Sequence, residues 1–458
     1  MDSVTFPAAS LSGGAPHPPP ARVWGPTLTG EAARRAREAV DAIGLELSNL
    51  VDEGTQLGAG VAGGDAGLAV FFHYLHRYGG DPGARRRAVE ALDRSLEAAG
   101  SSYQPPTLYS GFAGVGWMIA HLQRLGMEEA LEVELDEIDA MVLAHLARPA
   151  RLARTDSRGV YDLIGGLVGL GVYAYERLPS AGGRECLTAV IGALEEMAER
   201  TDEGATWFTP PELMPDANRA RHPRGWYNLG LAHGVPGVVA LLAWAAGAGV
   251  DAARSRALMG DALRWLMSQR LPAGSGSAFS TIRPPGGAPL GPSRDAWCYG
   301  DPGVGIALLG AARAVGDPAL ERDAIEILRG AAEHDFTTAQ VEDVPLCHGA
   351  AGLAHIYNRA FHATGDEIVG RAAAEWYGHT LRMRAPGTGI GGYTYRTVEE
   401  REFRHVPRAG LLEGSAGIAL ALMAGLTGVE PTWDRFLMTH VPEAATGAGT
   451  ASFSTSEP

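Results

Sequence analysis

The sequence predicts an all-α protein, a closed double ring or (α/α)7 toroid of seven outer and seven inner helices. A few short strands are expected in its long loops. Two observations predict this fold. A Gly-x-x-Gly unit recurs seven times, and each unit opens an apolar segment. Between these units lie segments whose charged and apolar residues alternate at helical period. One repeat domain is therefore expected, although 458 residues would otherwise suggest about three domains of roughly 150 residues.

The seven units share their spacing and their position at the start of an apolar segment. Glycine allows the chain to turn sharply and to pack closely at these points. The first glycines of the units are Gly64, Gly111, Gly166, Gly234, Gly300, Gly349 and Gly414. If all inner helices begin at the same end of the ring, the residues at their starts meet at one mouth.

The segments that follow the units are nearly free of charge over their first turns, so helices formed there are buried on all sides. They cover residues 67–76, 114–123, 169–175, 237–249, 303–312, 352–357 and 417–426. Hydrophobic residues make up 46% of the chain, enough for a large core. The intervening segments, such as 31–43, 82–99, 186–200 and 319–334, have one wet face and predict the outer ring.

The toroid is expected to occupy residues 28–440. Residues 1–27 are rich in Pro, Gly and Ala and predict a disordered tail, and residues 441–458 predict a second flexible tail. Three longer connections, at about 201–229, 272–297 and 384–411, interrupt the repeats. Loops of this length are often functional, and we expect them over the mouth, with short strands such as the one in GGYTYRT.

Charge and cysteine content exclude several classes. Lys and Arg total 38 against 53 Asp and Glu, for a net charge of −15, which disfavours nucleic-acid binding. The most apolar stretch contains Pro236, His233 and several glycines, so no transmembrane segment is predicted. No secretory signal is visible. Three cysteines argue against a disulfide framework and for a cytoplasmic protein.

Two of the cysteines lie beside repeat glycines. Cys298 precedes Tyr299 and Gly300, and Cys347 with His348 precedes Gly349. Two thiolates and an imidazole form a suitable Zn²⁺ set, and three protein ligands leave a fourth position open, as in catalytic sites. The alternative is two core cysteines and a hydrogen-bonded histidine. The equivalent repeat positions favour zinc. Cys186, on an amphipathic segment, is expected to be core.

Four polar residues lie at the same level of the repeats and are candidate catalytic groups: His233, Asp162, Arg294 and Tyr299. Each also has a structural interpretation. Asp162 could cap a helix, His233 could be a core histidine, and Arg294 could form a surface ion pair. Helix capping is the favoured interpretation of the remaining acidic residues at repeat starts, Asp65, Asp301 and Glu413.

The strings Tyr-Asp-Leu-Ile-x-Gly-Leu-x-Gly, Ala-His-Gly, Ser-Arg-x-x-Trp-Cys-Tyr-Gly and Cys-His-Gly resemble the lanthionine synthetase C family over about residues 28–440. The resemblance implies a double ring of seven outer and seven inner helices. It implies Cys298, Cys347 and His348 as zinc ligands, and Asp162, His233, Arg294 and Tyr299 as the other active-site positions.

The implied activity is that of a stand-alone cyclase for lanthipeptides, a class that includes the lantibiotics. Such an enzyme adds a cysteine thiol to dehydroalanine or dehydrobutyrine in a ribosomally made precursor peptide, giving lanthionine or methyllanthionine. The repeats use up the chain, so a separate dehydratase is expected to make the substrate, and a transporter is a further candidate partner. Zn²⁺ would hold the substrate cysteine as thiolate, and His233 is the preferred proton carrier.

Three alternatives stay open on the sequence alone. Relatives of this kind can add glutathione to dehydroamino acids in proteins, and the motifs do not separate the two activities. A non-catalytic, zinc-stabilised peptide-binding scaffold would need the same ligands. A helical-ring glycosidase would use paired carboxylates such as Asp162, Asp301 and Glu413.

Overall fold

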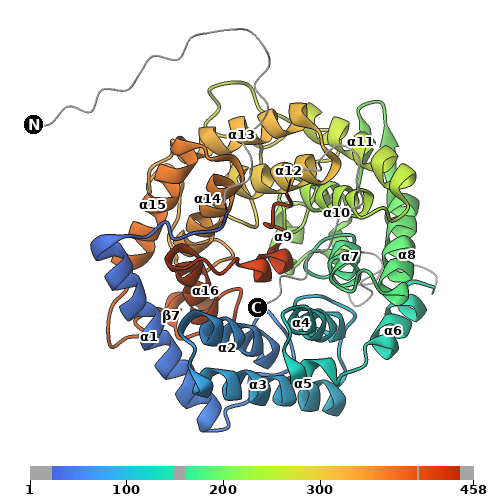
Figure 1. The fold of residues 1–458 in the computed structure, drawn as a ribbon. Coiled ribbons are helices and arrows are strands. Elements are labelled where there is room, and N and C mark those ends of the chain that lie inside the picture. The colour runs from blue at the N-terminus through green and yellow to red at the C-terminus, as the bar shows by residue number, and fades with distance from the viewer. Residues whose placement is uncertain (1–22, 148–159, 400–401, 444–458) are drawn as a thin grey trace, which may run out of the picture.

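The helices of the protein form two concentric rings around one axis (Figure 1). This computed structural model describes residues 23–147, 160–399 and 402–443. The inner ring consists of α2 (Asp65–Gly79), α4 (Phe112–Arg124), α7 (Leu167–Glu176), α10 (Val235–Gly247), α12 (Asp301–Val315), α14 (Ala350–Thr364) and α16 (Ser415–Leu426). The outer ring consists of α1 (Gly30–Asp52), α3 (Pro82–Ser101), α6 (Asp136–Leu146), α8 (Ala181–Met197), α11 (Ala252–Ser268), α13 (Pro318–Ala332) and α15 (Glu367–Arg382).

Both rings are closed by contacts between the two ends of the chain. Each inner helix contacts the next inner helix, and α16 contacts α2. The first outer helix, α1, packs against the last inner helix, α16. The seven-plus-seven toroid predicted from the repeats is therefore confirmed.

The two rings differ in how much of each helix is buried, as expected from their apolar and amphipathic sequences. All residues of α16 are buried, whereas α1 buries one stripe that includes Ala36, Val40, Ile43 and Leu47. A stripe at spacings of three and four is the inward face of an amphipathic helix. The inner ring therefore forms the core of the molecule, and the outer ring shields it from solvent.

The second glycine of each unit is required by close packing. A Cβ atom at Gly67 would lie 2.2 Å from the carbonyl oxygen of Val61, and one at Gly417 would lie 1.9 Å from that of Leu411. Both distances are far below van der Waals contact. The loop before each inner helix thus folds back against the first turn of that helix, and any side chain at these positions would push it away.

Short elements occupy the connections. They are α5 (Glu128–Leu131), α9 (Asp216–Arg221), η2 (Pro211–Leu213), η3 (Thr432–Leu437), β1 (Glu199–Thr201), β2 (Gly204–Thr206), β3 (Phe208–Thr209), β4 (Trp226–Asn228), β5 (Ile282–Arg283), β6 (Tyr395–Glu399) and β7 (Glu402–Val406). The strands pair antiparallel as β1–β2, β3–β4–β5 and β6–β7. The long connections thus contain short strands, as expected, including one that begins within GGYTYRT.

The C-terminal segment with η3 enters the centre of the ring (Figure 1). Its Asp434 accepts a hydrogen bond from Arg359 Nε at 2.7 Å, and Arg435 lies 3.5 Å from Glu176. Both carboxyl groups are buried. We call Glu430 to Val441 the plug, because these residues fill the axis between the inner helices.

The predicted tails fall largely outside the described residues, at 1–22 and 444–458. Within the described part of the N-terminal segment, Trp24 stacks on His362 of α14, with ring centroids 4.0 Å apart. Its indole N–H donates to the carbonyl of Ala424 in α16. Among the described residues, no helix has the length and apolarity needed to cross a membrane.

Candidate metal centre

Backbone hydrogen bonds join the loops that precede the inner helices into an open ring around the mouth. Among the described residues, no such bond joins the second repeat to the third. The bonded residues lie two places before the first glycine of their units, or three places before it in the third repeat. The bonds run from Ala62 N to Tyr109 O, Leu163 N to Ala232 O, Ala232 N to Cys298 O, Cys298 N to Cys347 O, Cys347 N to Leu412 O and Leu412 N to Ala62 O, at 2.9 to 3.3 Å. Equivalent repeat positions therefore become neighbours, although dozens of residues separate them in the sequence.

This ring places the three predicted ligands together. The ligand atoms of Cys298, Cys347 and His348 all lie within 4.8 Å of one another. Cys298 is 5% exposed, and the side chain of His348 is 19% exposed. Two sulfurs and an imidazole nitrogen are a donor set that suits Zn²⁺, and their separation allows tetrahedral binding by three protein groups. The residues present therefore fit a zinc ion.

The two neighbouring thiols ionise at different pH, because each one changes the pKa of the other. A hydrogen bond from the Cys347 thiol, helped by the Arg294 guanidinium, lowers the pKa of Cys298 to about 7 despite burial. Arg294 Nη2 lies 4.0 Å from the Cys298 sulfur. The neighbouring sulfur and burial raise the pKa of Cys347. One thiolate is thus accessible near neutral pH, and a cation would favour loss of the second proton.

His233 and Asp162 form a dyad beside the ligands. His233 Nδ1 lies 2.6 Å from Asp162 Oδ2, and the two side chains are 39% and 13% exposed. Burial opposes a charged imidazole, but the carboxylate outweighs it and raises the pKa of His233. The other carboxylate oxygen, Asp162 Oδ1, accepts the amide of Gly165 at 2.8 Å. Asp162 therefore both holds the turn before α7 and orients an accessible histidine.

Tyr299 lies between this dyad and the ligand pair. Its ring stacks on His233 with centroids 5.9 Å apart, and Asn228 Nδ2 donates to its hydroxyl at 3.1 Å. Burial raises the pKa of Tyr299, so the phenol stays protonated at neutral pH. The four predicted groups, Asp162, His233, Arg294 and Tyr299, thus lie on the Cys298 side of the ligand set.

The other residues singled out at repeat starts have different surroundings. Asp65 pairs with Arg94 and accepts the amide of Leu57. Asp301 accepts the amides of Ala278 and Phe279. Both carboxylates therefore hold loops in place. Cys186 is fully buried, as expected for a core residue.

Sequence reasoning missed three side chains near the centre. Asn228 fixes the Tyr299 hydroxyl, and Tyr395 of β6 meets His348 edge to face at 5.9 Å. Asp343 Oδ2 lies 3.9 Å from His348 Nε2 and accepts the amide of Arg396. None of the three belongs to a Gly-x-x-Gly unit, so the repeat pattern gave no signal for them. Only a closer inspection of the long connections could have suggested Tyr395.

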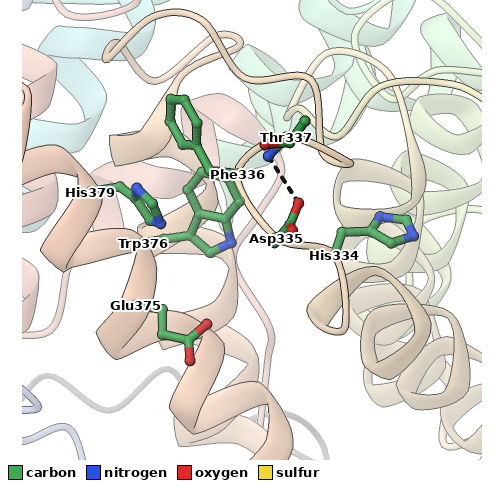
Figure 2. Close-up of a pocket in the computed structure, with 7 residues that line it drawn as sticks. All are labelled: His334, Asp335, Phe336, Thr337, Glu375, Trp376 and His379. Carbon is green, nitrogen blue, oxygen red and sulfur yellow. Dashed lines mark hydrogen bonds between the residues drawn. The ribbon is translucent and has the colours of Figure 1, made fainter.

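A surface cavity of about 230 Å³ lies apart from the centre, between α15 and the segment after α13. Figure 2 shows its Phe336, Trp376 and His379 rings gathered together, while His334 points away from them. His334 Nδ1 instead lies 2.8 Å from Asp295 Oδ2. The cavity contains none of the predicted ligands or catalytic groups, so the chemistry of the mouth does not involve it.

Comparisons with known proteins identify the family and the fold of the chain. Residues 55–438 match the family described as lanthionine synthetase C-like protein. The nisin biosynthesis protein NisC of Lactococcus lactis subsp. lactis is 25% identical over 266 residues, which cover 55% of this chain and 61% of that protein. The chain thus spans about three fifths of the length of this relative. A solved structure of nisin cyclase superposes with a TM-score of 0.70 at 19% identity, covering 88% of this chain and 97% of the other. The fold is therefore shared with nisin cyclase, and the chain belongs to the lanthionine synthetase C-like family.

Proposed function

We propose that this protein is a zinc-dependent cyclase that forms lanthionine and methyllanthionine rings in a dehydrated, ribosomally made peptide. The observation that carries the proposal is the convergence of Cys298, Cys347 and His348 within 4.8 Å at the mouth of the toroid. A dyad, a cation and a phenol stand on one side of them. Membership of the family and the similarity to NisC support a peptide substrate.

The proposed reaction is an addition that balances within the peptide. A C–S bond forms between a cysteine sulfur and the β-carbon of a dehydro residue, the C=C π bond breaks, and the α-carbon gains a proton. The cysteine thiol loses one proton, so the peptide is isomerised without a change in mass. Zinc bound by the three ligands would supply a Lewis acid that keeps the incoming cysteine as thiolate.

His233 is suited to carry the proton. It is accessible, and Asp162 orients its ring through Nδ1 and raises its pKa, so the protonated form persists towards neutral pH. Nε2 is then the nitrogen free to face a substrate. General acid catalysis by such a group contributes about 10²–10⁴-fold in rate.

Arg294 and Tyr299 are suited to stabilise the negative charge that develops on the carbonyl oxygen of the dehydro residue. A guanidinium and a protonated phenol are donors that need no rearrangement during the reaction. Asn228 holds the Tyr299 hydroxyl, so its direction is fixed. Both residues lie on the same side of the ligands as His233, where the enolate and its proton donor must meet.

The test is incubation of the zinc-loaded protein with a dehydrated precursor peptide, followed by thiol alkylation and mass analysis. Ring formation leaves the peptide mass unchanged and removes alkylatable thiols. Added glutathione separates the alternative activity, because that product gains the mass of glutathione and keeps its cysteines. A peptide that binds but retains every thiol would overturn the cyclase proposal and favour a binding scaffold.

A further inference from the structure

The residue directly before the first glycine of each unit points to one more member of the site. These positions hold Gly63, Ser110, Gly165, His233, Tyr299, His348 and Glu413. Three of them, His233, Tyr299 and His348, already have roles in the proposed reaction. Glu413 occupies the same register in the seventh repeat, and no step described so far uses it.

Glu413 differs from the two acidic residues that hold loops in its position relative to the repeat glycine. Asp65 and Asp301 follow their glycines and form the first residues of α2 and α12. Their carboxylates are occupied by Arg94 or by backbone amides. Glu413 precedes its glycine and is half-buried at the mouth. Neither side chain caps its own helix, so these loop contacts explain the first two carboxylates, but not the third.

The backbone ring places Glu413 and His233 on opposite sides of the ligands. Cys298 is bonded to Ala232, which precedes His233, and Cys347 is bonded to Leu412, which precedes Glu413. The two cysteines are bonded to each other. The order around the mouth is therefore histidine dyad, ligand pair, glutamate.

Contacts on the Cys347 side support this placement. Burial and the nearby Glu413 carboxylate raise the pKa of the Tyr395 phenol, so the two side chains are neighbours. The Tyr395 ring in turn meets His348 edge to face, and Arg408 covers it at 4.8 Å. The negative charge of Glu413 also contributes to the raised pKa of Cys347. The carboxylate is thus held close to two metal ligands by a neighbour on β6.

Each side of the mouth carries charges of both signs. On the Cys298 side, Asp162 pairs with His233 and leaves the Arg294 guanidinium beside the Cys298 sulfur. On the Cys347 side, Arg408 lies over Tyr395, and the carboxylates of Glu413 and Asp343 outnumber it. A developing enolate is attracted to the first side and repelled by the second. An ionised carboxylate accepts hydrogen bonds only, so it favours the N–H groups of the peptide.

We propose that Glu413 is a substrate-binding residue that accepts hydrogen bonds from backbone N–H groups flanking the reacting cysteine. In this way it orients the peptide across the mouth, with the cysteine segment on the Cys347 side and the dehydro residue on the Arg294 side. Tyr395 is the positioning residue that holds its carboxylate. This inference rests on the proposed cyclase function and adds the direction in which the substrate lies.

The experiment compares wild type, Glu413→Gln and the control Glu402→Gln, all zinc-loaded, with the same dehydrated peptide. Glu402 is an exposed carboxylate on β7, so its variant makes the same charge change on the neighbouring hairpin. We expect Glu413→Gln to raise KM about tenfold, the scale of one charge-assisted hydrogen bond. The turnover number and the zinc content should stay near wild type, and Glu402→Gln should match wild type in all three.

A peptide methylated at the amide nitrogen next to the cysteine gives a second, independent arm. The methyl group should raise KM for the wild-type protein but cause little further increase for Glu413→Gln, because the two changes remove one contact. The proposal would be overturned if the methyl group raised KM by the same factor for the wild type and for Glu413→Gln, because the two changes would then act independently. It would also be overturned by a KM for Glu413→Gln equal to that of Glu402→Gln, or by a loss of zinc from Glu413→Gln. If the wild type forms no rings, the proposed function itself fails, which is a distinguishable result.

Discussion

The mouth and the plugged end of the ring gather polar side chains in opposite ways. At the mouth, the side chain of His233 is 39% exposed, and one of its nitrogens is held by Asp162. Within the plug, Asp434 is fully buried between Arg359 and His355. Against the plug, Glu176 of α7 is buried between Arg124, His121 and the plug residue Arg435. The polar side chains at the mouth remain accessible to a substrate, whereas the charged side chains at the plug are paired with one another and buried.

This difference shows that the two ends of the inner helices have different tasks, one in chemistry and the other in stability. Loops that begin the inner helices carry side chains from several repeats to one point, and those side chains need only local support. The far ends of the same helices would leave an open axis, and the plug fills it. The two ends still meet, because Trp297, next to ligand Cys298, donates its indole N–H to Leu437 O at 2.8 Å. Changes at the mouth should therefore alter chemistry, and changes in the plug should alter stability.

The largest effect is expected from Cys347→Ala at the mouth. Zinc content should fall to near zero, and ring formation should drop by about 10³-fold or more, since a metal supplies several kcal/mol of stabilisation. Metal analysis and the thiol-alkylation assay measure the two losses. Cys186→Ala is the matched control, because that cysteine is buried away from the centre and should keep its zinc. Retention of zinc by Cys347→Ala would remove this cysteine from the ligand set.

His233→Ala should come next. We expect ring formation to slow by about 10²–10⁴-fold, with zinc content and melting temperature close to wild type, because the imidazole carries the proton but holds no metal. Single-turnover assays with a saturating peptide report the chemical step. A variant that cyclises at the wild-type rate would eliminate His233 from the mechanism.

Asp434→Asn tests the plug. Among the described residues, removing this charge leaves Arg359 with Glu430 as its one remaining ionic partner. The free energy of unfolding should therefore fall by about 3–5 kcal/mol, the cost of breaking a buried pair. Urea unfolding at neutral pH measures it. Asp261→Asn, which removes an exposed pair with Arg200 and Arg264, should cost less than about 1 kcal/mol. Equal costs for both variants would contradict the contrast between the two ends.

The smallest effect concerns pH. Burial lowers the pKa of His73 on α2 to about 3. The unfolded chain, with a histidine pKa of about 6.5, takes up the proton first as pH falls, so stability drops by about 1.4 kcal/mol per pH unit below that value. The loss continues down to the folded pKa. The raised pKa of His233 acts in the opposite direction, since its contribution is present below about 6.5 and is lost as pH rises through the folded value.

The variant His73→Gln tests whether His73 causes the predicted loss of stability as pH falls. Urea midpoints at about pH 7 and pH 5.5 should differ less in the variant than in wild type, by the contribution of one proton. A wild-type slope in the variant would show that His73 takes no part.

Particular residues show how far the sequence could be interpreted. The register of the seven glycines was enough to predict the toroid and to place Cys298, Cys347 and His348 at one mouth. Glu413 belongs to the same register, but a lone glutamate before a helix predicts helix capping equally well. Its closeness to Tyr395 depends on how a hairpin from another connection folds over the mouth.

The sequence by itself determined the repeat, the two helix types and the donor atoms of the centre, because periodicity and residue chemistry are local properties. The tertiary structure alone decided which groups support those atoms. Asn228 beneath Tyr299, Asp343 beside His348 and the plug between Arg359 and Glu176 are contacts between distant segments. Such contacts depend on how the ring closes and how its loops pack, and no short stretch of sequence encodes that closure.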